Sequence, residues 1–140
     1  MTTPLTGGCL CGAVRYQSSA EPVIAANCHC HDCQRATGSG YAPTLFVPTD
    51  SLSITGEVKY HAAKGDTGHS VRRGFCPNCG SQLFGLVELM PGLTAVRAGS
   101  LDNPAAFKPT IDIYVASAQP WDHMDPALPK FDKLPPRARD

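Results

Sequence analysis

The chain has 140 residues and a mass of 14.8 kDa, which fits a single domain large enough to bury a hydrophobic core. Twelve basic residues balance twelve acidic ones, which argues against the basic surface of a nucleic-acid-binding or membrane-surface protein. No apolar run approaches the ~20 residues of a membrane-spanning helix, and residues 1–8 lack the pattern of a signal peptide, so we expect a cytoplasmic protein.

A low charged content of 17%, with 13 glycines and 13 prolines, favours short strands joined by turns. Alternating side chains predict a first strand over residues 13–17, and a second over 22–26 leads into the central cysteines. One or two helical turns are expected over 31–38, ending at Gly38. Further strands are expected over 41–47, 51–55, 58–62, 69–75, 81–87, 93–98 and 110–117, with a short helix over 102–107. Pro43 and Pro48 indicate that the strand over 41–47 lies at a sheet edge or is bounded by bulges.

The segment from Gln119 onward is rich in proline and irregular. Its apolar side chains, Trp121, Met124, Leu128 and Phe131, are expected to pack this segment onto the domain. We therefore expect one domain over residues 1–134, mostly antiparallel β, followed by a loose tail over 135–140.

Seven cysteines fall into three clusters: Cys9 and Cys11, then Cys28, Cys30 and Cys33, then Cys76 and Cys79. In a reducing compartment, clustered cysteines are more often metal ligands than disulfides. Four thiolates close a tetrahedral zinc site, whereas three leave a position open. Seven therefore suggests one structural zinc ion and one chemically available zinc ion.

The run Cys76-Pro77-Asn78-Cys79-Gly80 is typical of a metal-binding turn. The alternative is a thioredoxin-like redox pair, which the position between two predicted strands disfavours. Cys9 and Cys11 would lie about 6.6 Å apart in an extended strand, so the neighbouring glycines must let the chain fold back if both bind one metal. Two buried core cysteines are the alternative for this pair.

Cys28, Cys30 and Cys33 could hold a zinc ion whose open position accepts a thiolate or water. A second structural site completed by a histidine is the alternative, with His29 and His31 inside the cluster and His61, His69 and His123 elsewhere. Counting also permits one site of Cys9, Cys11, Cys28 and Cys30 and another of Cys33, Cys76 and Cys79. Thiol redox sensing by the central three cysteines is a further alternative.

Three cysteine motifs and the C-terminal segment resemble the glutathione-dependent formaldehyde-activating enzyme family, which includes centromere protein V. The motifs are Gly8-Cys9-Leu10-Cys11-Gly12-Ala13-Val14-Arg15-Tyr16, Cys28-His29-Cys30-His31-Asp32-Cys33-Gln34-Arg35-Ala36-Thr37-Gly38-Ser39 and Arg73-Gly74-Phe75-Cys76-Pro77-Asn78-Cys79-Gly80. The ending is similar as well, in Ile111-Asp112-Ile113-Tyr114-Val115, Pro120-Trp121 and Leu128-Pro129-Lys130-Phe131. The resemblance spans nearly the whole chain, with all seven cysteines in order.

The resemblance implies a β-tent fold and two zinc ions per chain. It assigns a structural zinc to Cys9, Cys11, Cys76 and Cys79, and a catalytic zinc to Cys28, Cys30 and Cys33, completed by water or a substrate thiol. It also implies a carbon–sulfur lyase that joins glutathione, or a similar thiol, to formaldehyde or another small aldehyde as an S-hydroxymethyl adduct, or runs the reverse reaction.

Gln34 departs from the family pattern, in which Arg or Lys is frequent, and this leaves Arg35 as the local cation. Arg35 is therefore the predicted contact for a carboxylate of glutathione, with Arg72, Arg73 and Lys59 as other candidates. His29 or His31 could shuttle a proton. The alternative function is a non-catalytic zinc module that binds a protein partner. An accessible open metal position would favour the enzyme, and neither function calls for nucleic acid or a membrane.

Overall fold

The structure is a computed structural model that describes residues 4–136. Within that range the chain forms ten strands, one α-helix and four single-turn 3-10 helices. In chain order these are β1 (Leu5–Gly8), β2 (Arg15–Ser18), β3 (Ile24–Cys28), α1 (His31–Thr37), β4 (Ala42–Pro48), η1 (Thr49–Ser51), β5 (Leu52–Thr55), β6 (Lys59–Lys64), β7 (Ser70–Phe75), β8 (Gln82–Val87), β9 (Leu93–Arg97), η2 (Ala98–Ser100), η3 (Pro104–Ala106), β10 (Ile111–Ile113) and η4 (Val115–Ser117). The predicted mostly β class with short helices is confirmed.

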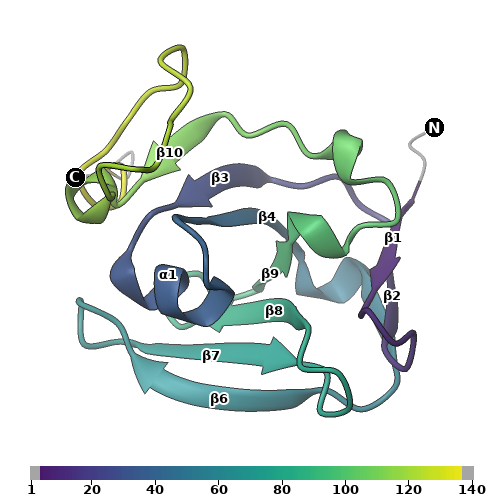
Figure 1. Ribbon diagram of the computed structural model, residues 1–140. Coiled ribbons are helices and arrows are strands. Elements are labelled where there is room, and N and C mark those ends of the chain that lie inside the picture. Colours follow the sequence, from purple (N-terminus) through teal and green to yellow (C-terminus); the bar gives the residue numbers. More distant parts are fainter. Residues whose placement is uncertain (1–3, 137–140) are drawn as a thin grey trace.

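The strands form two sheets. A three-stranded sheet has the order β1-β2-β5, and a seven-stranded sheet has the order β10-β3-β4-β9-β8-β7-β6. All neighbouring strands are antiparallel except β10 and β3, which are parallel. In Figure 1, β1 and β2 stand at one side of the large sheet, while α1 lies toward the other side, in front of the strands.

Alternation along the strands of the large sheet separates two environments. On one face, Leu45, Val47, Phe84 and Val96 enter the hydrophobic core with Tyr16 of the small sheet. The rings of Tyr16 and Phe84 meet edge to face, 5.3 Å apart. Residues of the opposite face line a cavity beside α1, and these are Ala26, Cys28, Thr44, Phe46, Val71, Arg73, Gly85, Val87, Ala95 and Arg97. The core therefore supports the large sheet from one side and leaves its other face for chemistry.

The N-terminal strand β1 was not predicted from the sequence, because its two glycines are poor strand formers. Gly7 is needed there for close packing: a Cβ on Gly7 would collide with the Tyr16 hydroxyl and the carbonyl oxygen of Ser100. The Tyr16 hydroxyl hydrogen-bonds to Ser100 Oγ at 2.6 Å beside this glycine. A small residue is therefore required where β1 passes the hydrogen bond between Tyr16 of β2 and Ser100 of η2.

The prediction of an edge position for the strand around Pro43 is wrong, since β4 lies between β3 and β9. β9 pairs with β4 only from Thr44 to Pro48, so Pro43 has a strand neighbour on the β3 side alone. Its missing N–H is tolerated at this position because the ladder to β9 has not yet begun.

The strand predicted over 110–117 is shorter than expected. It ends at Ile113 because Tyr114 has left-handed backbone angles, with φ 58° and ψ 36°, and starts η4. The segment after η4 returns beside β10, where Asp112 N–H donates to the Pro129 carbonyl and Phe131 N–H donates to the Asp112 carbonyl. Of its apolar side chains, Met124, Leu128 and Phe131 are half-buried, which confirms the expected packing for these three.

The expectation that Trp121 is packed onto the domain is wrong, since its side chain is 62% exposed. Of the predicted tail over 135–140, residues 137–140 lie outside the described residues. The single-domain boundary at residue 134 stays a prediction.

Candidate metal centres

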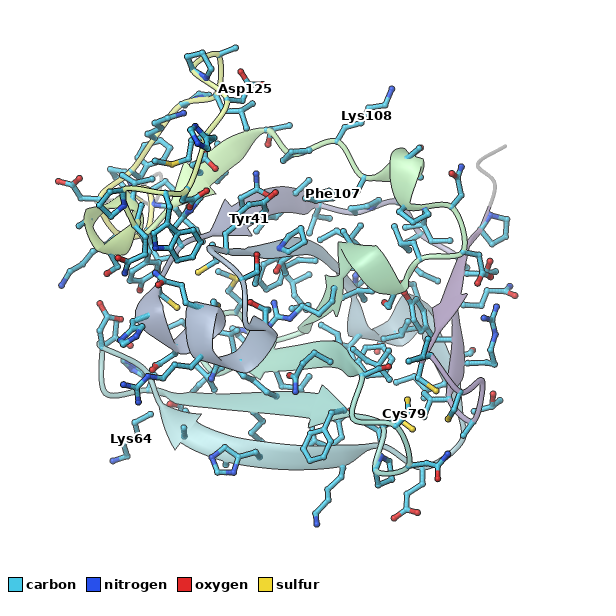
Figure 2. The ribbon with its side chains drawn as sticks, in the orientation of Figure 1. Tyr41, Lys64, Cys79, Phe107, Lys108 and Asp125 are labelled. Atoms are coloured by element: carbon cyan, nitrogen blue, oxygen red, sulfur yellow. The ribbon has the colours of Figure 1, made fainter. Side chains whose placement is uncertain are left out.

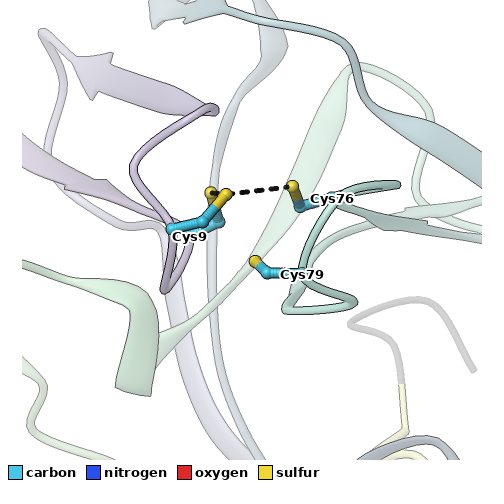
Figure 3. A group of neighbouring side chains, drawn as sticks. Cys9, Cys76 and Cys79 are labelled. Carbon is cyan, nitrogen blue, oxygen red and sulfur yellow. Dashed lines mark hydrogen bonds between the residues drawn. The ribbon is translucent and has the colours of Figure 1, made fainter.

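The structure brings Cys9, Cys11, Cys76 and Cys79 together, with their sulfur atoms all within 4.8 Å of one another. Cys11 Sγ lies 3.6 Å from Cys9 Sγ and 3.8 Å from Cys76 Sγ. Sulfur atoms at zinc bonds of about 2.3 Å in a tetrahedron are separated by roughly 3.8 Å. Figure 3 shows the side chains of Cys9, Cys76 and Cys79 pointing toward one another. This donor set fits a tetrahedral metal ion.

Two tight turns present these four sulfurs. In the first turn, Gly12 N–H donates to the Cys9 carbonyl, and Gly12 has a φ of +82°. In the second, Gly80 N–H donates to the Cys76 carbonyl, and Gly80 has a φ of +78°. Glycine tolerates this left-handed region without steric cost. The first turn follows β1 and the second joins β7 to β8, so the group links segments far apart in sequence.

Polar groups around two of these sulfurs, those of Cys9 and Cys79, favour the thiolate form. Val14 N–H donates to Cys9 Sγ at 3.2 Å, and Asn78 Nδ2 donates to Cys11 Sγ at 3.2 Å. The hydroxyl and backbone N–H of Ser81 lower the pKa of Cys79 to about 5. Hydrogen bonds to a thiolate stabilise its charged form, and the thiolate is the form that binds metal.

The second group consists of Cys28, Cys30 and Cys33, whose sulfurs also lie within 4.8 Å of one another. Cys28 ends β3, Cys30 is the N-cap residue of α1, and Cys33 lies in the first turn of that helix. Cys30 Sγ accepts a hydrogen bond from Cys33 N–H at 3.3 Å. The strand end and the helix start thus aim three sulfurs at one point.

The three thiols hydrogen-bond with one another, and this changes their pKa values in opposite directions. Hydrogen bonds with Cys28 and Cys30 lower the pKa of Cys33, and the positive charges of Arg97 and Arg73 add to the effect, while burial opposes it. The same contacts with Cys30 and Cys33, together with burial, raise the pKa of Cys28. A metal ion that binds all three as thiolates would remove the repulsion between their negative charges.

The two groups differ in their surroundings. Cys28, Cys30 and Cys33 line the cavity beside α1, which has a volume of about 370 Å³. None of the four other cysteines lines it. In Figure 2, Cys79 lies on the side of the molecule away from α1. The structure therefore groups the sulfurs as four and three, and of these two groups the group of three lines this cavity.

His29 is held away from both groups. Its Nδ1 lies 2.6 Å from Asp122 Oδ2 and its Nε2 lies 2.8 Å from Asp112 Oδ1, and its side chain is 1% exposed. Lys130 Nζ donates to the second oxygen of Asp112 at 3.1 Å. Both ring nitrogens are thus occupied by carboxylates, and His29 has a structural position joining β3 to β10 and the C-terminal segment. His31 is exposed and lies at the cavity.

Gln34 also has a structural position. Its amide nitrogen donates to the carbonyls of His29 and Ser117, at 2.8 and 2.9 Å, and its oxygen accepts from Gln119 at 3.1 Å. The side chain is therefore buried between α1 and the segment after β10, where an amide can both donate and accept.

The predicted cationic contacts lie in different places. Arg35 is exposed on α1 and does not line the cavity, so its role in binding a thiol stays a prediction. The guanidinium of Arg72 lies over the Tyr60 ring, 4.9 Å from its centre, and Lys59 is exposed on β6. Only Arg73 of these four lines the cavity.

Arg97, which lines the cavity from β9, was not predicted from the sequence. A lone charged residue ending the apolar run Leu93-Thr94-Ala95-Val96 was the available signal. Asp112 was missed in the same way, as a charge between two isoleucines of β10.

Residues 4–136 contain no helix with the length and apolar character needed to span a membrane.

The family model described as "GFA: Glutathione-dependent formaldehyde-activating enzyme" matches residues 4–117. The "Putative glutathione-dependent formaldehyde-activating enzyme" of Halomonas elongata is 33% identical over 104 residues, covering 71% of this chain and 66% of that protein. A relative of the same name from Phaeosphaeria nodorum is 27% identical over 135 residues, covering 89% of this chain and 70% of that protein. The chain thus spans about two thirds of the length of these curated relatives.

A crystal structure of a Rhodobacter sphaeroides protein has a similar fold, with a TM-score of 0.56 and 23% identity over 72% of this chain and 93% of that chain. The family match covers all three cysteine motifs that form the two sulfur groups. The chain therefore belongs to the glutathione-dependent formaldehyde-activating enzyme family.

Proposed function

We propose that this protein is a zinc-dependent carbon–sulfur lyase. It joins a thiol, glutathione or a similar one, to a small aldehyde such as formaldehyde, and catalyses the reverse reaction as well. The observation that carries the proposal is the position of Cys28, Cys30 and Cys33 at the wall of a cavity of about 370 Å³. The family membership supports the choice of thiol and aldehyde.

Two zinc ions per chain are proposed, with unequal roles. Cys9, Cys11, Cys76 and Cys79 would enclose one ion completely, since four thiolates fill its tetrahedral coordination. Cys28, Cys30 and Cys33 would hold the other. A zinc ion held by three cysteines supplies a fourth position at which a substrate thiol loses its proton and stays nucleophilic.

The chain's own residues would prepare this site in two ways. The end of β3 and the N-cap of α1 fix the three sulfurs before substrate arrives. Apolar lining residues, among them Phe46, Val71 and Ile113, limit water around the reacting groups. In the reaction, the thiol sulfur bonds to the aldehyde carbon while the thiol proton passes to the aldehyde oxygen. Thiol and aldehyde atoms are all kept in the S-hydroxymethyl product.

The test measures exchange between free thiol and adduct at equilibrium by NMR, because the uncatalysed reaction also reaches equilibrium. Zinc-loaded protein should accelerate exchange between glutathione and its formaldehyde adduct above the protein-free rate. Cys33→Ser should return exchange to that rate, while the control His61→Ala, on exposed β6, should not. Wild-type protein that leaves the exchange rate unchanged would contradict the proposal.

A further inference from the structure

Two arginines enter the cavity from separate strands of the large sheet. Arg73 is on β7 and Arg97 is on β9, and both line the cavity that holds the three sulfurs. Because side chains alternate along a strand, Val71 and Ala95 lie on the same face as these arginines, whereas Arg72 points to the other face and stacks on Tyr60. The cavity therefore holds two guanidinium groups in its wall.

These guanidinium groups are only partly satisfied by protein partners. The Nε atoms of Arg73 and Arg97 are both buried without a hydrogen-bond partner in residues 4–136. Arg97 donates from Nη1 to Thr44 Oγ1 at 2.6 Å, but neither arginine forms an ion pair with a carboxylate in the described part of the chain. A buried N–H donor without a partner is costly, so such donors in native proteins are usually hydrogen-bonded.

The charged residues at the cavity mouth do not supply this pairing. Asp32, Asp66 and Asp132 line the cavity but are exposed. Asp66 already accepts a hydrogen bond from the Tyr114 hydroxyl at 2.9 Å and forms an ion pair with Lys133 at 3.5 Å. The acidic groups are thus exposed, whereas Arg73 and Arg97 are half-buried and have no carboxylate partner among residues 4–136.

The Cys33 thiolate offsets part of this positive charge. Burial lowers the pKa of Arg97, and the nearby charge of Arg73 lowers it further, whereas the Cys33 thiolate acts in the opposite direction. Both arginines are therefore within electrostatic reach of the sulfur group and of each other. An anion near the sulfurs would relieve the repulsion between the two guanidinium groups.

We propose that Arg73 and Arg97 form a carboxylate subsite, which selects thiols that carry a carboxylate over neutral thiols of the same size. The planar donor fork of a guanidinium matches the two oxygens of a carboxylate. The inference rests on the proposed function in taking a thiol as the ligand of this cavity. It adds two residues that discriminate among thiols, and it places the bound carboxylate in the same cavity as the three sulfurs.

The test compares the binding of two thiols to zinc-loaded protein by calorimetry, without any aldehyde. 3-Mercaptopropionate carries a carboxylate, and 3-mercapto-1-propanol is its neutral counterpart. Wild-type protein should prefer the carboxylate, and Arg73→Gln and Arg97→Gln should each reduce that preference about tenfold, the loss expected for a charge-assisted contact. Arg72→Gln, the neighbour on the opposite face of β7, should keep the wild-type preference.

Other outcomes overturn the inference. If both thiols weaken equally in Arg73→Gln and Arg97→Gln, the arginines only balance thiolate charge. If Arg35→Gln alone removes the preference, the carboxylate binds at α1. No wild-type preference, or no binding of either thiol, also refutes the subsite. Because aldehyde is absent, a preserved carboxylate preference in a protein that fails the exchange assay would refute the proposed reaction while supporting the subsite. Zinc content and circular dichroism of each variant confirm folding.

Discussion

Cys11→Ser isolates the contribution of the four-cysteine group to stability. Cys11 is exposed and lies outside the hydrophobic core, so serine there disturbs little packing. Its sulfur meets a partner 65 residues away in sequence. A cross-link that closes a loop of this length removes unfolded-chain entropy worth about 4 kcal/mol. We expect a comparable loss of unfolding free energy, which lowers the midpoint of thermal unfolding by roughly 10–15 °C for a domain of this size.

Cys30→Ser is the matched control in the three-cysteine group. That group spans only residues 28–33, so the same entropy relation gives about 2 kcal/mol. Serine is also a favoured N-cap residue, which preserves the start of α1. The assay is urea and thermal unfolding followed by circular dichroism, with zinc counted in each variant. Equal losses of stability in the two variants, or no loss in Cys11→Ser, would refute the reasoning.

Two further predictions concern packing and buried charge. Gly7→Ala should lower the free energy of unfolding by about 1–3 kcal/mol, because the added methyl collides with the Tyr16 hydroxyl. The control Gly99→Ala, where a Cβ meets no atom within 4 Å, should change this free energy little. Equal urea midpoints for the two variants would count against the close approach of β1 to Tyr16. His29→Ala should lower the free energy of unfolding by about 3–5 kcal/mol, because it leaves two buried carboxylates without their shared imidazole. The control His61→Ala, at an exposed position, should change this free energy little. A wild-type urea midpoint for His29→Ala would show that the His29 network does not hold the C-terminal segment.

The sequence predicted most strands because their alternating side chains match the two environments of the large sheet. Gly38 ends α1 as predicted, with a φ of +71° and an N–H that donates to the Gln34 carbonyl. β1 escaped prediction because its strand geometry depends on packing against Tyr16, which local propensity does not encode. The early end of β10 depends in the same way on the left-handed conformation of Tyr114, which residue type disfavours.

The candidate site was predictable as far as the cysteines, whose spacing within each motif is local. The spacing did not decide which cysteines meet across 65 residues of sequence. That grouping follows from the pairing of strands. Arg97 and the carboxylate partners of His29 come from β9, β10 and the C-terminal segment, all distant in sequence from the central motif. Their contribution depends on sheet order, and a single charged residue in an apolar strand gives only a weak local signal.

Zinc X-ray absorption before and after addition of glutathione tests the unequal division of sulfur between two zinc ions most directly. Protein with two zinc ions should show about 3.5 sulfur neighbours per zinc, the mean of four and three, and about four after glutathione binds. Four sulfur neighbours at the outset, with no change on adding glutathione, would contradict the account.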